Sequence, residues 1–424
     1  MKWISTRGAS PPVPFIDALF AGTAPDGGLY MPERFDPLPP GTIDGLRGAD
    51  IVEIASAVGA HILRDEIPAA DLTTLVQDAL NFAVPLVQVT DRVWALELFH
   101  GPTLAFKDVG ARTQARLLHH FTDGTPLTML VATSGDTGSA VAQAFHRVPD
   151  TGVVVLYPEG KVSDIQEAQM ASLGDNITAV AVQGTFDDCQ RLVKQAFADD
   201  DLRKHIWLTP ANSINLGRLL PQIFYYFVIA RLDNPIISVP SGNFGSLTAG
   251  LMAHRLGLPV KRFVAATNVN DVVPEYLESG EYRPRPSIRT VANAMDVGAP
   301  SNFERMRSLY DNDPERMRRD ITGAAFDDAR VVAEIGRVHR STGYLLDPHG
   351  AIAWLGLQQV LAEHPGATGV FLATAHPAKF REVVEPAIGQ PVTLPPALSD
   401  ALARPRHSVR LPAEYPALLA LLRP

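Results

Sequence analysis

The chain has 424 residues, of which 46% are hydrophobic and 20% are charged, and its formal net charge is −9. This negative charge argues against a nucleic acid or an anionic membrane as the main partner, although local geometry can still hold small anions. The single cysteine, Cys189, excludes an intrachain disulfide and a cysteine-based metal site. We see no signal peptide and no run of eighteen apolar residues, so we expect a soluble cytoplasmic protein with two or three domains.

The first ninety or so residues are interrupted by Pro and Gly. Residues 25–32, Pro-Asp-Gly-Gly-Leu-Tyr-Met-Pro, predict a turn that leads into a short extended piece. Helical patterns follow over residues 51–63 and 69–82. Because this part contains no cluster of titratable side chains, we expect residues 1–92 to form a separate N-terminal domain.

The rest of the chain alternates between strand and helix patterns. We expect strands over residues 93–99, 127–133, 152–157, 177–182, 207–209, 236–240, 260–267 and 369–374. Helices are expected over 109–119, 246–256, 327–341 and 351–363, and from near Gly138, Ser163 and Thr185. This alternation predicts an α/β fold with two open parallel sheets. We expect a large domain of residues 93–126 and 225–424 and a small domain of residues 127–224.

Lys107 is the first candidate for chemistry. Ala105 and Phe106 precede it and Asp108 follows it, at the end of a strand-like apolar run. Burial in such surroundings disfavours the ammonium form and lowers the pKa of a lysine. A neutral amine can attack a carbonyl to form a Schiff base. The alternative is that Lys107 only begins a surface helix.

Two loops follow the ends of predicted strands, where open parallel sheets bind their ligands. Residues 132–138, Ala-Thr-Ser-Gly-Asp-Thr-Gly, place small and hydroxyl side chains before a helix, which suits a carboxylate or a plain N-cap. Residues 238–246 contain Gly242 and Gly245, whose backbone N–H groups can surround an anion. This loop lacks both the P-loop lysine and a G-x-G-x-x-G pattern, so a monophosphate remains.

Two further segments carry polar groups. Thr374, at the end of the last predicted strand, offers a hydroxyl that can bond a heterocyclic nitrogen without charging it. His376 precedes a proline in a tight turn, so a structural role is favoured and a catalytic one stays open. Residues 211–218 begin a helix with amide and hydroxyl groups and end at Arg218, whose planar fork suits phosphate. The alternative is a capped helix with a surface arginine.

A lysine in an apolar segment, a glycine-rich phosphate loop and a terminal strand hydroxyl fit pyridoxal 5′-phosphate. The chain resembles the threonine synthase family, of the fold type II (tryptophan synthase β-like) pyridoxal-phosphate enzymes, over essentially its whole length. The motifs that carry the resemblance lie at residues 25–30, 99–108, 134–138, 212–215, 242–245, 293–297 and 374–377.

The resemblance implies a role for each candidate. Lys107 would hold the cofactor as a Schiff base, and Thr374 would bond the pyridine nitrogen. The cofactor phosphate would be held by Gly242, Asn243, Phe244 and Gly245. Ser134 and Thr137 would lie near the substrate carboxylate, and the substrate phosphate would lie near Asn212, Ser213 and Arg218. Many fold type II enzymes carry Asn where this chain has Asp136, and that side chain meets the 3′-oxygen of the cofactor.

The resemblance also implies the reaction. A lyase of this family converts O-phospho-L-homoserine and water into L-threonine and phosphate, the last step of threonine biosynthesis. Alternatives are a threonine or serine dehydratase, a phospho-lyase that adds no water, and a non-catalytic binder that has kept the fold. A metal hydrolase is disfavoured because the twelve histidines form no H-E-x-x-H pair. We expect a monomer or a homodimer that acts on a small molecule.

Overall fold

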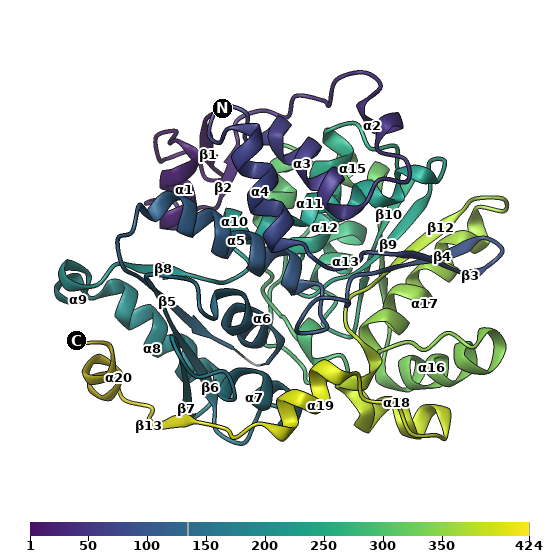
Figure 1. Cartoon of the computed structure of the whole chain (residues 1–424). Helices are drawn as coiled ribbons and strands as arrows, with labels where there is room; N and C mark the ends of the chain where they lie inside the picture. Colours follow the sequence, from purple (N-terminus) through teal and green to yellow (C-terminus); the bar gives the residue numbers. More distant parts are fainter. Residues whose placement is uncertain (134, 424) are drawn as a thin grey trace.

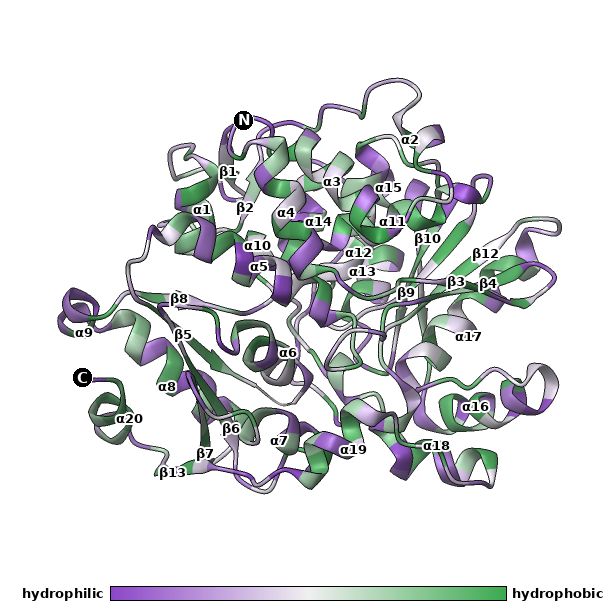
Figure 2. Ribbon diagram, viewed as in Figure 1, coloured by the Kyte–Doolittle hydropathy of each residue, from purple (hydrophilic) through white to green (hydrophobic). Residues whose placement is uncertain are grey.

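The computed structural model describes residues 1–133 and 135–423. Two sheets lie side by side beneath an N-terminal layer of helices, and the C-terminal segment runs along the opposite side of both sheets (Figure 1). Strand interiors are predominantly hydrophobic in both sheets (Figure 2). This composition is expected for parallel strands that are covered on both faces.

The five-stranded sheet has the order β13-β7-β6-β5-β8, and all its pairings are parallel. Its strands are β5 (Leu127–Ala132), β6 (Thr151–Pro158), β7 (Ile177–Gln183), β8 (Leu208–Pro210) and β13 (Ser408–Pro412). The associated helices are α6 (Asp136–Phe145), α7 (Asp164–Ala171), α8 (Phe186–Ala198) and α9 (Asp200–His205). The predicted alternation is confirmed here. At α7, Ser163 and Gln166 form a capping box, which fixes the helix start.

The six-stranded sheet has the order β11-β10-β9-β12-β4-β3. Its strands are β3 (Leu86–Thr90), β4 (Val93–Glu97), β9 (Ile236–Pro240), β10 (Arg262–Thr267), β11 (Ile321–Ala325) and β12 (Gly369–Ala373). All pairings are parallel except the β3–β4 hairpin. The helices of this part are α5 (Lys107–Thr122), α12 (Gly245–Arg255), α13 (Val272–Ser279), α14 (Phe303–Leu309), α15 (Pro314–Asp320), α16 (Asp328–Thr342), α17 (Pro348–Glu363) and α18 (Arg381–Ile388).

The N-terminal layer contains β1 (Trp3–Ser5), α1 (Phe15–Ala21), β2 (Tyr30–Pro32), α2 (Thr42–Gly45), α3 (Ile51–Ile62) and α4 (Ala69–Ala79). Its core includes Trp3 and Phe15, both fully buried. Helix α4 packs on α5, where Arg112 donates from Nε to the carbonyl oxygen of Ala79 at 2.6 Å. The layer is therefore anchored to the helix that begins at Lys107.

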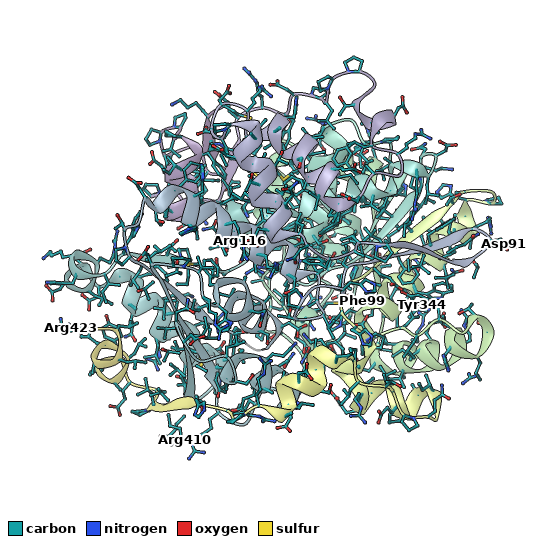
Figure 3. The ribbon with its side chains drawn as sticks, in the orientation of Figure 1. Asp91, Phe99, Arg116, Tyr344, Arg410 and Arg423 are labelled. Atoms are coloured by element: carbon teal, nitrogen blue, oxygen red, sulfur yellow. The ribbon has the colours of Figure 1, made fainter. Side chains whose placement is uncertain are left out.

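Three short helices, α10 (Leu216–Leu219), α11 (Gln222–Tyr226) and η1 (Phe227–Arg231), connect the five-stranded sheet to β9. After α18 the chain returns through α19 (Pro396–Ala403), β13 and α20 (Tyr415–Leu422) to the five-stranded sheet, where Arg410 and Arg423 are labelled in Figure 3. Helix α19 packs on α7 and α20 packs on α8.

The strand pairing differs from two of the expected domain ranges. Residues 1–92 were expected to form one N-terminal domain, yet β3 pairs with β4 in the six-stranded sheet. Residues 225–424 were expected to stay in the large domain, yet β13 pairs with β7 of the other sheet. Both strands lie at sheet edges. Because an edge strand pairs on one side only and can have one exposed face, its sequence shows a weaker hydrophobic pattern. The other boundaries remain predictions.

Within residues 1–133 and 135–423, no helix is both long and apolar enough to cross a membrane.

Candidate active site

Lys107 is the first residue of α5 and follows the loop that leaves β4. Its side chain is partly buried, and its Nζ lies 5.8 Å from the centre of the Phe106 ring. Burial lowers the pKa of Lys107 to about 8, which Asp136 opposes and Lys379 and Arg218 reinforce. Roughly a quarter of the side chain is then neutral near pH 7.5, against about one part in a thousand for an ordinary lysine. The predicted reactive amine therefore has the required environment.

Asp108, the neighbour of Lys107, shapes the loop before it. Its carboxylate accepts from the Thr103 N–H at 2.8 Å and from the Thr103 hydroxyl at 2.7 Å. Gly101 is needed because a Cβ there would lie 2.5 Å from Oδ2 of Asp108. Full burial raises the pKa of Asp108 to about 6, although both Thr103 bonds favour the ionised form. The loop is thus folded around a buried carboxylate.

Asp136 is the first residue of α6 and is almost completely buried. Its Oδ1 lies 2.8 Å from Nζ of Lys379 and accepts from Nε2 of Gln166 at 3.0 Å. Burial alone would raise the pKa of Asp136, but Lys379 and Lys107 hold it well below its usual range. Asp136 and Lys107 therefore lie within electrostatic influence of each other, and Lys379 is an additional lysine beside Asp136.

The loop around Asp136 is held by Thr133. Its Oγ1 accepts from the N–H groups of Gly135 and Gly138, both at 2.9 Å. Thr137 lies in the first turn of α6 and is partly exposed. Ser134, the other residue expected near the substrate carboxylate, lies outside the described residues.

The segment from Gly242 to Gly245 joins β9 to α12. A Cβ at Gly242 would lie 2.7 Å from the Cα of Met295, so the loop touches the backbone of the 3-10 turn η2 (Asn293–Met295). Phe244 takes a left-handed conformation with φ 59°, which is uncommon for a residue with a side chain. Among the described residues no side chain caps α12. The first N–H groups of this eleven-residue helix can therefore bind an anion.

Asn243 links this loop to two other segments. Its Nδ2 donates to the Ser213 hydroxyl at 2.5 Å, and its Oδ1 accepts from the Ser301 N–H at 2.6 Å. Ser213 and Asn243, which were expected at the substrate and cofactor phosphates, are thus in direct contact.

Arg218 lies in α10 and is 3% exposed. Its Nη1 donates to the carbonyl oxygen of Ala211 at 2.6 Å, while its Nε is buried without a partner among the described residues. Burial lowers the pKa of Arg218 to about 10. A Cβ at Gly110 would lie 2.5 Å from the Arg218 carbonyl oxygen, so Arg218 packs one turn along α5 from Lys107. The alternative of a surface arginine is wrong.

Asn212, by contrast, is exposed. It lines a cleft of about 1550 Å³ between α1 and the strands β5 and β8. The structure therefore places it at an opening of the molecule, whereas Ser213 is partly buried and Arg218 is almost completely buried.

Thr374 follows β12 and is 6% exposed. Its carbonyl oxygen accepts from the Phe106 N–H at 2.8 Å, which ties the end of β12 to the Lys107 segment. His376 caps the next turn, because its Nδ1 accepts from the Ala378 N–H at 3.1 Å. Its ring meets Phe99, labelled in Figure 3, edge-on at 5.4 Å, and burial lowers its pKa. These contacts describe a structural histidine, the favoured interpretation of the sequence.

Two buried cations were not predicted from the sequence. Lys379 is one, although it stands between Ala378 and Phe380 and so satisfies the criterion that singled out Lys107. Arg305 in α14 is the other: it is fully buried and donates to the carbonyl oxygens of Tyr30 and Ile214 and to Oδ1 of Asn302. Nothing in the local pattern around Arg305 distinguishes it from a surface arginine, because its partners come from distant segments.

These features fit a cofactor that carries an aldehyde and a phosphate. Lys107 supplies an amine of lowered pKa, and α12 supplies uncapped N–H groups behind a loop that only glycine can form at residue 242. Arg218 and Arg305 donate to carbonyl and amide oxygens, and neither bonds a carboxylate among the described residues. Among the described residues, no acceptor meets the buried Nε of Arg218, whose charge acts on Lys107.

The fold and this site define a pyridoxal-phosphate enzyme of fold type II. Residues 76–375 match the family described as pyridoxal-phosphate dependent enzyme. Residues 2–80 match the family described as threonine synthase N terminus, and residues 350–421 match threonine synthase, C-terminal. The chain belongs to the threonine synthase family, whose members are pyridoxal-phosphate-dependent lyases.

Known threonine synthases are similar to this chain over its full length. Threonine synthase from Escherichia coli (strain K12) is 44% identical over 428 residues, which cover 100% of this chain and 99% of that protein. Its crystal structure matches with a TM-score of 0.92 at 43% identity, covering 100% of this chain and 99% of that one. The crystal structure of PLP-bound threonine synthase from Brucella melitensis matches with a TM-score of 0.94 at 38% identity, covering 100% and 98%.

Proposed function

We propose that this chain converts O-phospho-L-homoserine and water into L-threonine and inorganic phosphate. The observation that carries the proposal is the 44% identity to a threonine synthase over the whole chain, including the N- and C-terminal segments specific to that family. The buried Arg218 and Arg305, neither bonded to a carboxylate among the described contacts, give independent support for a phosphorylated substrate.

Lys107 is the central catalytic residue of the proposal. Pyridoxal 5′-phosphate, when bound, supplies an electron sink for the carbanions that arise beside the substrate amine. Lys107 would hold this cofactor through Nζ, and once free its amine would take the proton from the substrate α-carbon. A pKa of about 8 suits this role, because an effective general base titrates near the working pH.

The remaining residues bind and orient. Gly242, Asn243, Phe244 and Gly245 would hold the cofactor phosphate at the start of α12. Thr374 would donate or accept at the pyridine nitrogen, and as a neutral group it leaves that nitrogen mostly uncharged. Asp136 would face the 3′-oxygen of the cofactor.

The substrate would be held at both ends. Thr137, together with Ser134, would bind its carboxylate at the start of α6. Its phosphate would be bound by Asn212, Ser213 and Arg218, and the planar guanidinium of Arg218 suits two phosphate oxygens. Asn212 is the exposed member of this set.

One assay tests the reaction and the catalytic residue together. Purified protein is given O-phosphohomoserine, and threonine, 2-oxobutyrate and phosphate are measured for the wild type, Lys107→Ala and the control Lys261→Ala, at an exposed lysine. We expect threonine and phosphate in equal amounts from the wild type and the control, and a loss of at least about a thousandfold in Lys107→Ala. Phosphate with 2-oxobutyrate and no threonine would identify a phospho-lyase instead. Turnover of threonine or serine alone would identify a dehydratase.

We further propose a monomer or homodimer in the cytoplasm. Cys189, the single cysteine of the chain, is buried in α8, so no intrachain disulfide can form. Light scattering on the purified chain and fractionation of cells test the two statements separately.

A further inference from the structure

Lys379 lies in the 3-10 turn η3 (Pro377–Phe380) that follows β12, and its side chain is completely buried. Its Nζ has two acceptors: Oδ1 of Asp136 at 2.8 Å and the carbonyl oxygen of Thr103 at 2.9 Å. Thr103 in turn belongs to the loop that precedes Lys107. A buried ammonium is retained only where it is paired and hydrogen-bonded, and Lys379 satisfies both conditions.

The pair also joins the two sheets. Asp136 begins α6, beside the five-stranded sheet, whereas Lys379 follows the central strand β12 of the six-stranded sheet. A further bond across this boundary is donated by Gln169 of α7 to the same Thr103 carbonyl oxygen, at 3.2 Å. The ion pair therefore fixes the position of Asp136 relative to the Lys107 loop.

Asp136 is near two lysines. Lys379 and Lys107 both stabilise the ionised carboxylate of Asp136, and Oδ1 also accepts a hydrogen bond from Gln166. The other charged or titratable groups that act on these lysines are Asp108 and His376 near Lys379 and Arg218 near Lys107. A carboxylate paired closely with Lys107 would stabilise its ammonium form and remove the nucleophile.

We propose that Lys379 is a positioning residue that occupies Asp136 in a buried ion pair, so that Asp136 does not pair with Lys107 and the Lys107 amine stays free to react. The proposal rests on the proposed role of Lys107 as the reactive amine. Lys379 acts in two ways: it provides the closer partner for Asp136, and its own positive charge disfavours a second ammonium nearby. The lowering of the Lys107 pKa by Lys379 agrees with this arrangement.

The test reads Lys107 directly, without substrate or turnover. Full-length chain freed of cofactor is trace-labelled with acetic anhydride between about pH 6 and 10, and the midpoint for Lys107 is read by mass spectrometry of its peptide. Lys379→Met should raise this midpoint by about one pH unit, so that acetylation near pH 7.5 falls about tenfold. Asp136→Asn should lower it, because the anion that favours the ammonium form is gone. Lys379→Arg, which keeps the charge, should stay near the wild type.

A Lys107 midpoint that rises in Lys379→Met and falls in Asp136→Asn distinguishes this role from a merely structural one. Lys261, exposed and distant in the same digest, is the internal control, and Lys261→Met is the matched variant that should leave the Lys107 midpoint unchanged. An unchanged or lowered midpoint in Lys379→Met, or shifts of the same sign in both partners, would overturn the proposal. If Lys379→Met does not fold, as judged by circular dichroism, Asp136→Asn and Lys379→Arg decide the question by the same criteria. Failure to make threonine leaves this readout intact, so the two proposals fail separately.

Discussion

The buried carboxylate of Asp108 makes a stability prediction that can be worked out from its surroundings. Asp108 is 0% exposed, and its pKa is raised from 3.8 to about 6 chiefly by burial. Asn is nearly the same size, and in Asp108→Asn the Thr103 N–H can still donate to the amide oxygen while the amide NH₂ donates to the Thr103 hydroxyl. The variant therefore removes the charge and keeps two hydrogen bonds.

The pH dependence follows from linkage. A carboxyl whose pKa is raised in the folded state favours folding while it is protonated, and this contribution is lost as the pH rises through about 6. A shift of about two units in the pKa of Asp108 corresponds in total to about 3 kcal/mol in the free energy of unfolding. Between about pH 5 and about pH 7.5 the part that is lost is about 1.4 kcal/mol. The amide does not titrate, so the stability of the variant should gain this amount relative to the wild type over that interval.

Guanidinium unfolding of the wild type and Asp108→Asn at the two pH values measures the difference in their free energies of unfolding. The control is Asp91→Asn, at the exposed tip of the β3–β4 hairpin labelled in Figure 3, for which the difference between the two pH values should be close to zero. A variant that is destabilised equally at both pH values would show that Asp108 is not a buried group of raised pKa, and the reasoning would be refuted.

Two further predictions concern binding. Gly242→Ala should weaken retention of pyridoxal phosphate on dialysis at least about tenfold, because its Cβ would lie 2.7 Å from the Cα of Met295, whereas Gly45→Ala, where no atom is near, should not. Arg218→Lys keeps the charge but loses the planar fork, so the KM for O-phosphohomoserine should rise about tenfold or more. The exposed Arg92→Lys is its control, and equal KM values for the two variants would contradict the proposed phosphate contact.

Local sequence patterns predicted most of the strands and helices. The strands β5, β6 and β7 are apolar runs bounded by helix caps such as Ser163, and they lie where periodicity predicts them. Strand β13 could not be predicted in this way, because four of its five residues are exposed and only its pairing with β7 defines it. Sheet membership at an edge depends on which neighbour is available in space, and a single sequence does not contain that information.

The candidate site likewise contains residues that short motifs predict and a residue pair that they do not. Lys107, the Gly242 loop and Arg218 carry recognisable residue types in short segments, and the structure brings Lys107 and Arg218 within electrostatic influence of each other. The Lys379–Asp136 pair depends on two segments far apart in the chain. Apolar neighbours around Lys379 were visible in the sequence, but its partner was not.

The strand order of the six-stranded sheet has a consequence for how the chain is made. Strand β12 pairs with β4 on one side and β9 on the other, so residues 369–373 fill the gap between strands synthesised much earlier. Strands β5 to β8 form a nearly contiguous block, residues 127–210, that needs only the edge strand β13 to be added later. On the ribosome, we expect the smaller sheet to assemble first, while β4 and β9 wait for their common neighbour. Lys107 would then acquire its surroundings only near the end of translation, since Thr374 and Lys379 arrive with β12 and the turn after it.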